Sequence, residues 1–187
     1  MNRLVRLLAV WLRARRHRGP GTPLDEWRTP LRVMPNDLDL LRHMNNGSYL
    51  TLMDIGRVDM LVRTGAQSAI SRRRWYPVVV GESIRFRRSL ELWDRFVIVT
   101  RVVGWDERIF YLEQRFERVP RAAKPADTAP EVVAEAWVAA RFIARAGGTV
   151  ASPDVAEAFE VAGVSPPVPD AVLAWARALD LAHRPRG

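Results

Sequence analysis

The stretch PNDLDLLRHMNNGSYLTLMDIGR, residues 35–57, joins a polar loop to a long apolar segment. From Asn46 to about residue 63 the apolar residues are almost continuous, which predicts a helix that is buried on most of its sides. Gly56 inside this helix costs about 1 kcal/mol of helix propensity. We therefore expect another element to pack closely against the helix at Gly56.

The composition is that of one globular domain. The chain has 187 residues, of which 48% are hydrophobic and 27% are charged. It contains no cysteine, which excludes a disulfide scaffold, a cysteine zinc site and a thiol nucleophile.

The positive charge is concentrated at the N-terminus. Residues 1–24 contain six of the 29 basic residues and no acidic residue. The remaining 23 basic residues are nearly balanced by 21 acidic ones, so we expect no nucleic-acid partner. The six basic residues are Arg3, Arg6, Arg13, Arg15, Arg16 and Arg18.

Residues 1–22 are predicted to form a basic amphipathic arm ahead of a domain at 23–187. Its apolar part is too short to span a membrane. Peripheral membrane contact through residues 1–18 is one interpretation, and a terminal helix that packs on its own domain is the other. We expect a cytoplasmic protein, with membrane association as the alternative. The residues predicted to share one apolar helical face are Leu4, Leu7, Leu8 and Trp11.

The remaining pattern predicts one strand before the buried helix and four after it. Residues 30–37 are extended, loops are expected at 64–77 and 119–131, and helices at about 152–184, with Ser152 capping the first. The order predicts an α+β fold in which an antiparallel sheet wraps a single helix. The later extended segments are 75–92, 95–105, 108–119 and 132–146.

The polar loop permits three kinds of chemistry. Asp37, Asp39 and His43 include metal-ligating types, but no second histidine lies nearby, so no metal is expected. Asn45 and its neighbours are helix-capping types. The third possibility is acyl transfer, because N–H groups at a helix start can stabilise an oxyanion and an upstream carboxylate can act as base or nucleophile.

The segment DLDLLRHMNNGSYLTLMDIGR resembles the D-x-D…H-[VM]-N-N-x-x-Y…[DE]-x-[AG]-R signature of hotdog-fold acyl-CoA thioesterases of the 4-hydroxybenzoyl-CoA thioesterase type. The resemblance extends through RVMPNDLDLLRHMNN, RFRRSLEL and RVVGWDERIFYLEQRF, covers about residues 24–180, and is closest to the thioesterase superfamily member six branch. It implies a five-stranded antiparallel sheet around one long helix and an acyl-CoA substrate. It also implies a homodimer or dimer of dimers with active sites at the interface, and no cofactor.

The resemblance also implies roles for single residues. Asp39 takes the position of the catalytic carboxylate, and the backbone N–H groups near Asn46 and Gly47 polarise the thioester carbonyl. His43 and Asn45 orient the loop or the substrate.

Other residues near the motif have weaker assignments. Tyr49 fills the tyrosine position of the signature and is assigned to substrate binding. Asp37 is expected to accept backbone hydrogen bonds, and Asp54, the candidate in other branches, is expected to pair with Arg57. Three arginines either meet the phosphates of coenzyme A or form a solvated strand face. They are Arg85, Arg87 and Arg88.

The leading functional hypothesis is hydrolysis of an acyl-CoA thioester. The alternative is a non-catalytic module that binds acyl-CoA or lipid at a membrane surface, because a fold does not guarantee its chemistry. A hotdog dehydratase fits the motif less well.

Overall fold

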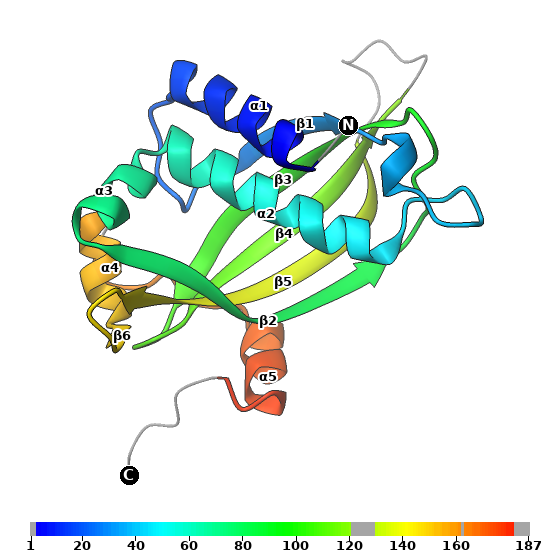
Figure 1. Ribbon diagram of the computed structural model, residues 1–187. Coiled ribbons are helices and arrows are strands. Elements are labelled where there is room, and N and C mark those ends of the chain that lie inside the picture. Colours follow the sequence, from blue (N-terminus) through cyan, green and yellow to red (C-terminus); the bar gives the residue numbers. More distant parts are fainter. Residues whose placement is uncertain (1–2, 121–129, 162, 182–187) are drawn as a thin grey trace.

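The computed structural model describes residues 3–120, 130–161 and 163–181 (Figure 1). Five strands form an antiparallel sheet in the order β1-β3-β4-β5-β2, and a two-residue strand, β6, pairs with β5. The α+β architecture expected from the sequence is confirmed. The strands are β1 Trp27–Arg32, β2 Trp75–Phe86, β3 Arg95–Trp105, β4 Phe110–Val119, β5 Glu131–Ala144 and β6 Thr149–Val150.

The central helix α2, Asn46–Arg63, lies across one face of this curved sheet (Figure 1). Gly56 is where helix and sheet approach most closely. A Cβ atom at Gly56 would stand 2.9 Å from Thr100 Oγ1 and 3.0 Å from Gln114 Nε2. The close packing predicted for Gly56 is confirmed, since a larger side chain there would meet two strands.

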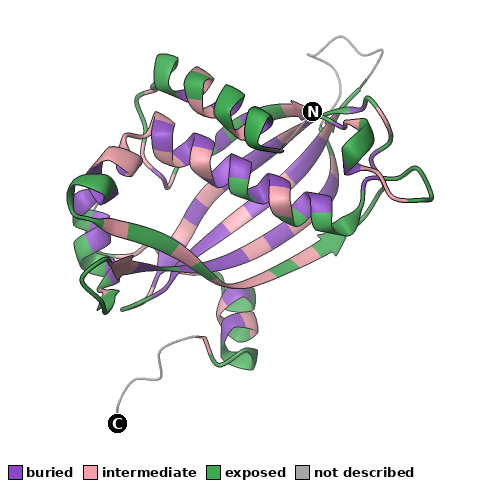
Figure 2. Ribbon diagram, in the orientation of Figure 1, coloured by how far each residue is buried: buried purple, intermediate pink, exposed green. Residues whose placement is uncertain are grey.

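The two faces of the sheet bury different partners. On β4, Phe110, Leu112 and Phe116 face α2, whereas Tyr111 joins a second apolar cluster with helix α5, Asp170–Ala178. This alternation follows from the period of two along a strand, and Figure 2 shows the buried residues concentrated between α2 and the sheet.

Three local predictions were wrong. Residues 30–37, expected to be extended, leave β1 at Arg32 and form a short 3-10 helix at Pro35–Asp37. The segment expected to be a loop at 64–77 contains helix α3, Ala66–Arg72. Helix α4, Ser152–Ala158, has Ala151 as its N-cap, and the buried Ser152 hydroxyl has no hydrogen-bond partner among the described residues. The tail forms two helices, α4 and α5, as predicted, and Pro166, Pro167 and Pro169 lie between them.

The N-terminal helix α1, Arg3–Arg16, packs against α2 (Figure 1). Its inward side consists of Arg6, Val10 and Ala14, all buried. The predicted apolar face is divided, because Leu7 and Trp11 are half-buried while Leu4 and Leu8 point to solvent. Within the described residues, no helix is long and apolar enough to cross a membrane.

Candidate active site at the start of the central helix

The loop that leads into α2 closes on itself as a narrow turn. Leu38 pairs with Met44 in an isolated antiparallel bridge. The Asp39 N–H donates to the His43 carbonyl at 2.8 Å, and the Arg42 N–H donates to the Asp39 carbonyl at 3.1 Å. Arg42 adopts a left-handed conformation with φ of 63°. The turn therefore fixes the backbone on both sides of Asp39.

The Asp39 carboxylate is held through one of its oxygens. Asp39 Oδ1 accepts the N–H groups of Leu41, at 2.9 Å, and His43, at 3.1 Å. Within the described part of the chain, Oδ2 has no hydrogen bond or ion pair. The side chain is half-buried. One oxygen is thus anchored to the turn, and the other is available to a ligand.

The start of α2 has one N–H group that the cap leaves unused. Asn45 is the N-cap, and its Oδ1 accepts the Gly47 N–H at 2.8 Å. The Ser48 N–H donates to the Asn45 carbonyl at 2.8 Å. The Asn46 N–H has no acceptor among the described residues. The pair of donors expected at Asn46 and Gly47 is therefore reduced to one that is free.

Two of the residues predicted around Asp39 are tied to the turn and to the helix start. His43 is exposed and supports Asp39 through its backbone N–H. Asn45 shapes the helix start through its amide oxygen. Among the described residues there is no group of three histidine or acidic side chains suited to a metal ion.

Asp37 has a structural role, as predicted. Its side chain is 4% exposed, and its Oδ2 accepts the Met34 N–H at 2.9 Å. The same oxygen lies 2.6 Å from Arg6 Nη1 in a buried ion pair with helix α1. Nothing in the sequence pattern indicated Arg6, because its partner lies 31 residues away.

Tyr49 lies in the core rather than at the surface of the loop. It is 2% exposed, and its ring meets Phe86 and Phe116 edge-on, with centroids 5.1 and 4.9 Å apart. Burial raises the pKa of the Tyr49 phenol above its ordinary value. These contacts give Tyr49 a packing role, and its contact with substrate stays a prediction.

The three arginines near the end of β2 differ in their partners. Arg87 makes a two-pronged contact with Glu135 at 2.9 and 2.7 Å, and Arg88 Nε lies 3.8 Å from Glu131. Arg85 forms no ion pair with any described residue and lines a shallow polar groove on the outer face of the sheet. The carboxylates of Glu113 and Glu135 line the same groove. Of the three arginines, only Arg85 has no ion-pair partner within the described residues.

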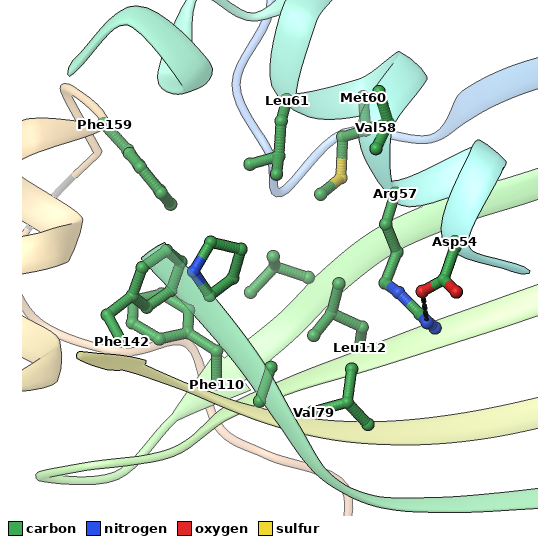
Figure 3. Close-up of a pocket in the computed structure, with 13 residues that line it drawn as sticks. Asp54, Arg57, Val58, Met60, Leu61, Val79, Phe110, Leu112, Phe142 and Phe159 are labelled. Atoms are coloured by element: carbon green, nitrogen blue, oxygen red, sulfur yellow. Dashed lines mark hydrogen bonds and ion pairs between the residues drawn. The ribbon is translucent and has the colours of Figure 1, made fainter. Parts of the chain in front are cut away.

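An apolar cavity of about 140 Å³ lies between α2 and β2 (Figure 3). Phe110, Phe142 and Phe159 line one part of it. Asp54 and Arg57 line another and are joined by an ion pair at 2.5 Å, as predicted. Asp54 is eight residues beyond Asn46, about 12 Å along the helix axis.

A comparison with family models identifies the family of the chain. A family model described as the thioesterase-like superfamily matches residues 33–176. The chain belongs to this superfamily. The turn at Asp39 and the helix start at Asn46 both lie inside the matched range.

Two curated relatives match part of this chain in sequence. Protein THEM6 of Xenopus laevis is 46% identical over 84 residues, 45% of this chain and 41% of that protein. Protein THEM6 of Danio rerio is 45% identical over 85 residues, 46% and 42% of the two chains. The matches thus span about two fifths of these relatives.

Solved structures of thioesterases share the fold. YbaW, a probable thioesterase from Escherichia coli, superposes with a TM-score of 0.62 at 24% identity, over 71% of this chain and 96% of that one. A mutant 4-hydroxybenzoyl CoA thioesterase in complex with 4-hydroxybenzoyl CoA gives 0.61 at 16% identity, over 71% and 97%. At these identities the likeness establishes the hotdog fold alone.

Proposed function

We propose that this protein hydrolyses an acyl-CoA thioester to the free acid and CoA, with Asp39 as the catalytic carboxylate. The observation that carries the proposal is the arrangement of Asp39, whose Oδ1 is held by two backbone N–H groups while Oδ2 is free of partners within the described residues. Two N–H donors on one oxygen also close ordinary turns. Catalysis at Asp39 therefore requires a neighbouring hydrogen-bond donor as well.

That donor is the Asn46 N–H at the positive end of α2. A thioester carbonyl that accepts this N–H is polarised, and the oxyanion formed on attack is stabilised there. As a general base, Asp39 Oδ2 takes a proton from water while the water oxygen attacks the acyl carbon. As a nucleophile, Oδ2 bonds to that carbon and water then hydrolyses the anhydride. In both routes the C–S bond breaks and CoA leaves.

A second copy of the chain completes the site in this proposal. Strand β2 pairs with β5 on one side and with no described strand on the other. Its exposed apolar side chains include Tyr76, Val79 and Phe86. Beside Asp39, the side chains of Leu40 and Leu41 are also exposed. Such surfaces favour association with another copy.

Pairing of two β2 edges about a twofold axis makes the strands antiparallel. The start of β2 in one copy, at Pro77 and Val79, then lies near the end of β2 in the other, at Phe86. Phe86 contacts Tyr49 in the first turn of α2. The acyl chain of a substrate at Asp39 therefore reaches the apolar cavity of the second copy, and Arg85 is the cation best placed to meet a CoA phosphate.

The test is thiol release from acyl-CoA substrates of increasing chain length. The chain contains no cysteine, so a thiol reagent detects only the CoA product. Asp39→Asn is expected to lower turnover at least about 100-fold, and Asp154→Asn, an exposed carboxylate on α4, serves as the control. No turnover by the wild type contradicts the proposal. If Asp54→Asn loses activity while Asp39→Asn retains it, Asp54 rather than Asp39 is the catalytic carboxylate.

A second candidate is a non-catalytic module that binds acyl-CoA or lipid at a membrane surface. It is favoured by the outward side of α1, where Leu4, Val5, Leu8 and Leu12 are exposed beside arginines (Figure 2). Two results together would support this candidate over the first. One is that the protein binds acyl-CoA tightly without hydrolysing it. The other is that it sediments with anionic liposomes, and that Leu4→Ser and Leu8→Ser abolish this sedimentation.

A further inference from the structure

A buried ion pair joins the N-terminal helix to the loop that carries Asp39. Arg6 Nη1 lies 2.6 Å from Asp37 Oδ2, and the two side chains are 3% and 4% exposed. Arg6 Nη2 also donates to the Arg32 carbonyl at 2.9 Å. Helix α1 is therefore fastened to the base of the loop by a charged group.

Asp37 connects this contact to both parts of the candidate site. It precedes Asp39 by two residues, and its carbonyl accepts the Asn45 N–H at 2.8 Å and the Ser48 hydroxyl at 3.1 Å. The side chain of Asp37 is held by α1, and its backbone holds the N-cap and first turn of α2. A shift of Asp37 consequently changes the separation between Asp39 Oδ2 and the Asn46 N–H.

Net stability is a weak explanation for this pair. Removing two charges from water costs about as much as their attraction returns, so a buried ion pair often adds little net stability. What it does supply is a fixed geometry. In addition, Arg6 lies outside residues 33–176, the segment that matches the thioesterase-like superfamily.

We propose that Arg6 is a positioning residue for the Asp39 site, so that efficient turnover requires helix α1 to be docked through the Arg6–Asp37 pair. This inference rests on the proposed thioesterase function. Arg6 contacts no reacting atom and acts through Asp37. Misplacement of a catalytic group by about 1 Å can cost roughly 100-fold in rate, so a small movement of the loop is sufficient.

The experiment compares Arg6→Met with Arg13→Met in the full chain. Arg13 is on the same helix, but it lies 4.0 Å from Asp59, toward the C-terminal end of α2 and away from the helix start at Asn46. We expect Arg6→Met to lower kcat roughly 10-fold to 100-fold with KM changed less than about threefold. Arg13→Met keeps kcat within about twofold. Arg6→Lys, which retains the charge, recovers most of the rate.

Two further measurements separate positioning from loss of folding. Thermal unfolding by circular dichroism identifies variants that do not fold, and if Arg6→Met is one of them, Arg6→Gln carries the test with the same expected loss. In an Asp39→Asn background, Arg6→Met is expected to produce no additional loss, because effects that act through one group are not additive.

The result that overturns the proposal is a folded Arg6→Met protein with kcat within about twofold of the wild type. An equal loss in Arg13→Met overturns it as well. If the wild type shows no turnover, the proposed function fails. Amide hydrogen exchange then tests separately whether the Arg6–Asp37 pair holds the loop around Asp39 in place. Arg6→Met, but not Arg13→Met, is then expected to accelerate exchange at Leu41, His43 and Asn45 about tenfold or more. Unchanged exchange rates in Arg6→Met contradict a role of the Arg6–Asp37 pair in holding this loop.

Discussion

The guanidinium of Arg57 on α2 donates to the buried carboxamide oxygen of Gln114 on β4 at 2.8 Å. Gln114 in turn donates to the Met53 carbonyl at 3.0 Å and to Thr100 Oγ1 at 2.9 Å. The same guanidinium lies 2.9 Å from Glu82 on the edge strand β2. A single cation therefore ties the central helix to the middle and to the edge of the sheet.

Replacement of Arg57 by methionine is expected to lower the free energy of unfolding by about 2–4 kcal/mol. The substitution preserves volume but leaves the Gln114 oxygen and the Glu82 carboxylate without their cation in a largely buried site. Chemical denaturation monitored by circular dichroism measures the change. Arg141→Met, an exposed arginine on β5, is the control, and equal stability of the two variants contradicts the role given to Arg57.

Gly56→Ala is expected to destabilise the fold by about 1–3 kcal/mol, although alanine is the better helix former. The new methyl group would stand 3.0 Å or less from Thr100, Gln114 and Ile98 on two strands. Gly163→Ala is expected to change stability by less than about 0.5 kcal/mol, because no described residue other than its chain neighbours has an atom within 4 Å of the added group. Thermal melts of the two variants provide the comparison, and a neutral Gly56→Ala refutes the close packing.

Val79→Lys is expected to convert the proposed dimer into a monomer. Val79 is on the free edge strand β2 and is 39% exposed, so a lysine there fits a solvated edge but not one paired with a second copy. Val164→Lys, at a more exposed site outside the sheet, leaves association unchanged. Light scattering coupled to gel filtration gives the mass. A wild-type protein that is already monomeric contradicts pairing through β2.

Tyr111→Phe is expected to cost about 1 kcal/mol near neutral pH. The Tyr111 hydroxyl donates to Asp106 Oδ2 at 2.8 Å, and burial, followed by this hydrogen bond, raises the pKa of the phenol. A raised pKa in the folded state stabilises the protein below the unfolded value of about 10, and this stabilisation is lost as pH rises further. The difference in stability between wild type and Tyr111→Phe therefore narrows above about pH 10. A difference that widens there is the contrary result.

Local signals in the sequence were sufficient for the main elements. The central helix begins at Asn46 as predicted, because Asn45 supplies a cap and the apolar residues that follow are continuous. Strand β3 has the predicted bounds because its β-branched residues end at a polar turn. The close approach at Gly56 was also visible, as an unfavourable residue in an otherwise good helix.

Features that depend on distant contacts were not predictable from the sequence. The inward face of α1 includes a buried arginine, Arg6, whose position is explained only by Asp37 on another element. Gly47 looked like a free donor, but whether its N–H is free depends on the rotamer of Asn45. Tyr49 matched a motif position and yet packs in the core. For Arg6 and Tyr49 the decisive partner is chosen by tertiary structure, and for Gly47 it is the local conformation of Asn45.

A single-turnover experiment shows whether Asp39 acts in cleavage of the thioester or only in substrate binding. Enzyme in excess over the best acyl-CoA substrate isolates the chemical step from product release. We expect Asp39→Asn to bind the substrate with an affinity within about threefold of the wild type. We also expect the mutant to cleave the substrate at least about 100-fold more slowly. Cleavage by Asp39→Asn at the wild-type rate would contradict the assignment of Asp39 as the catalytic carboxylate.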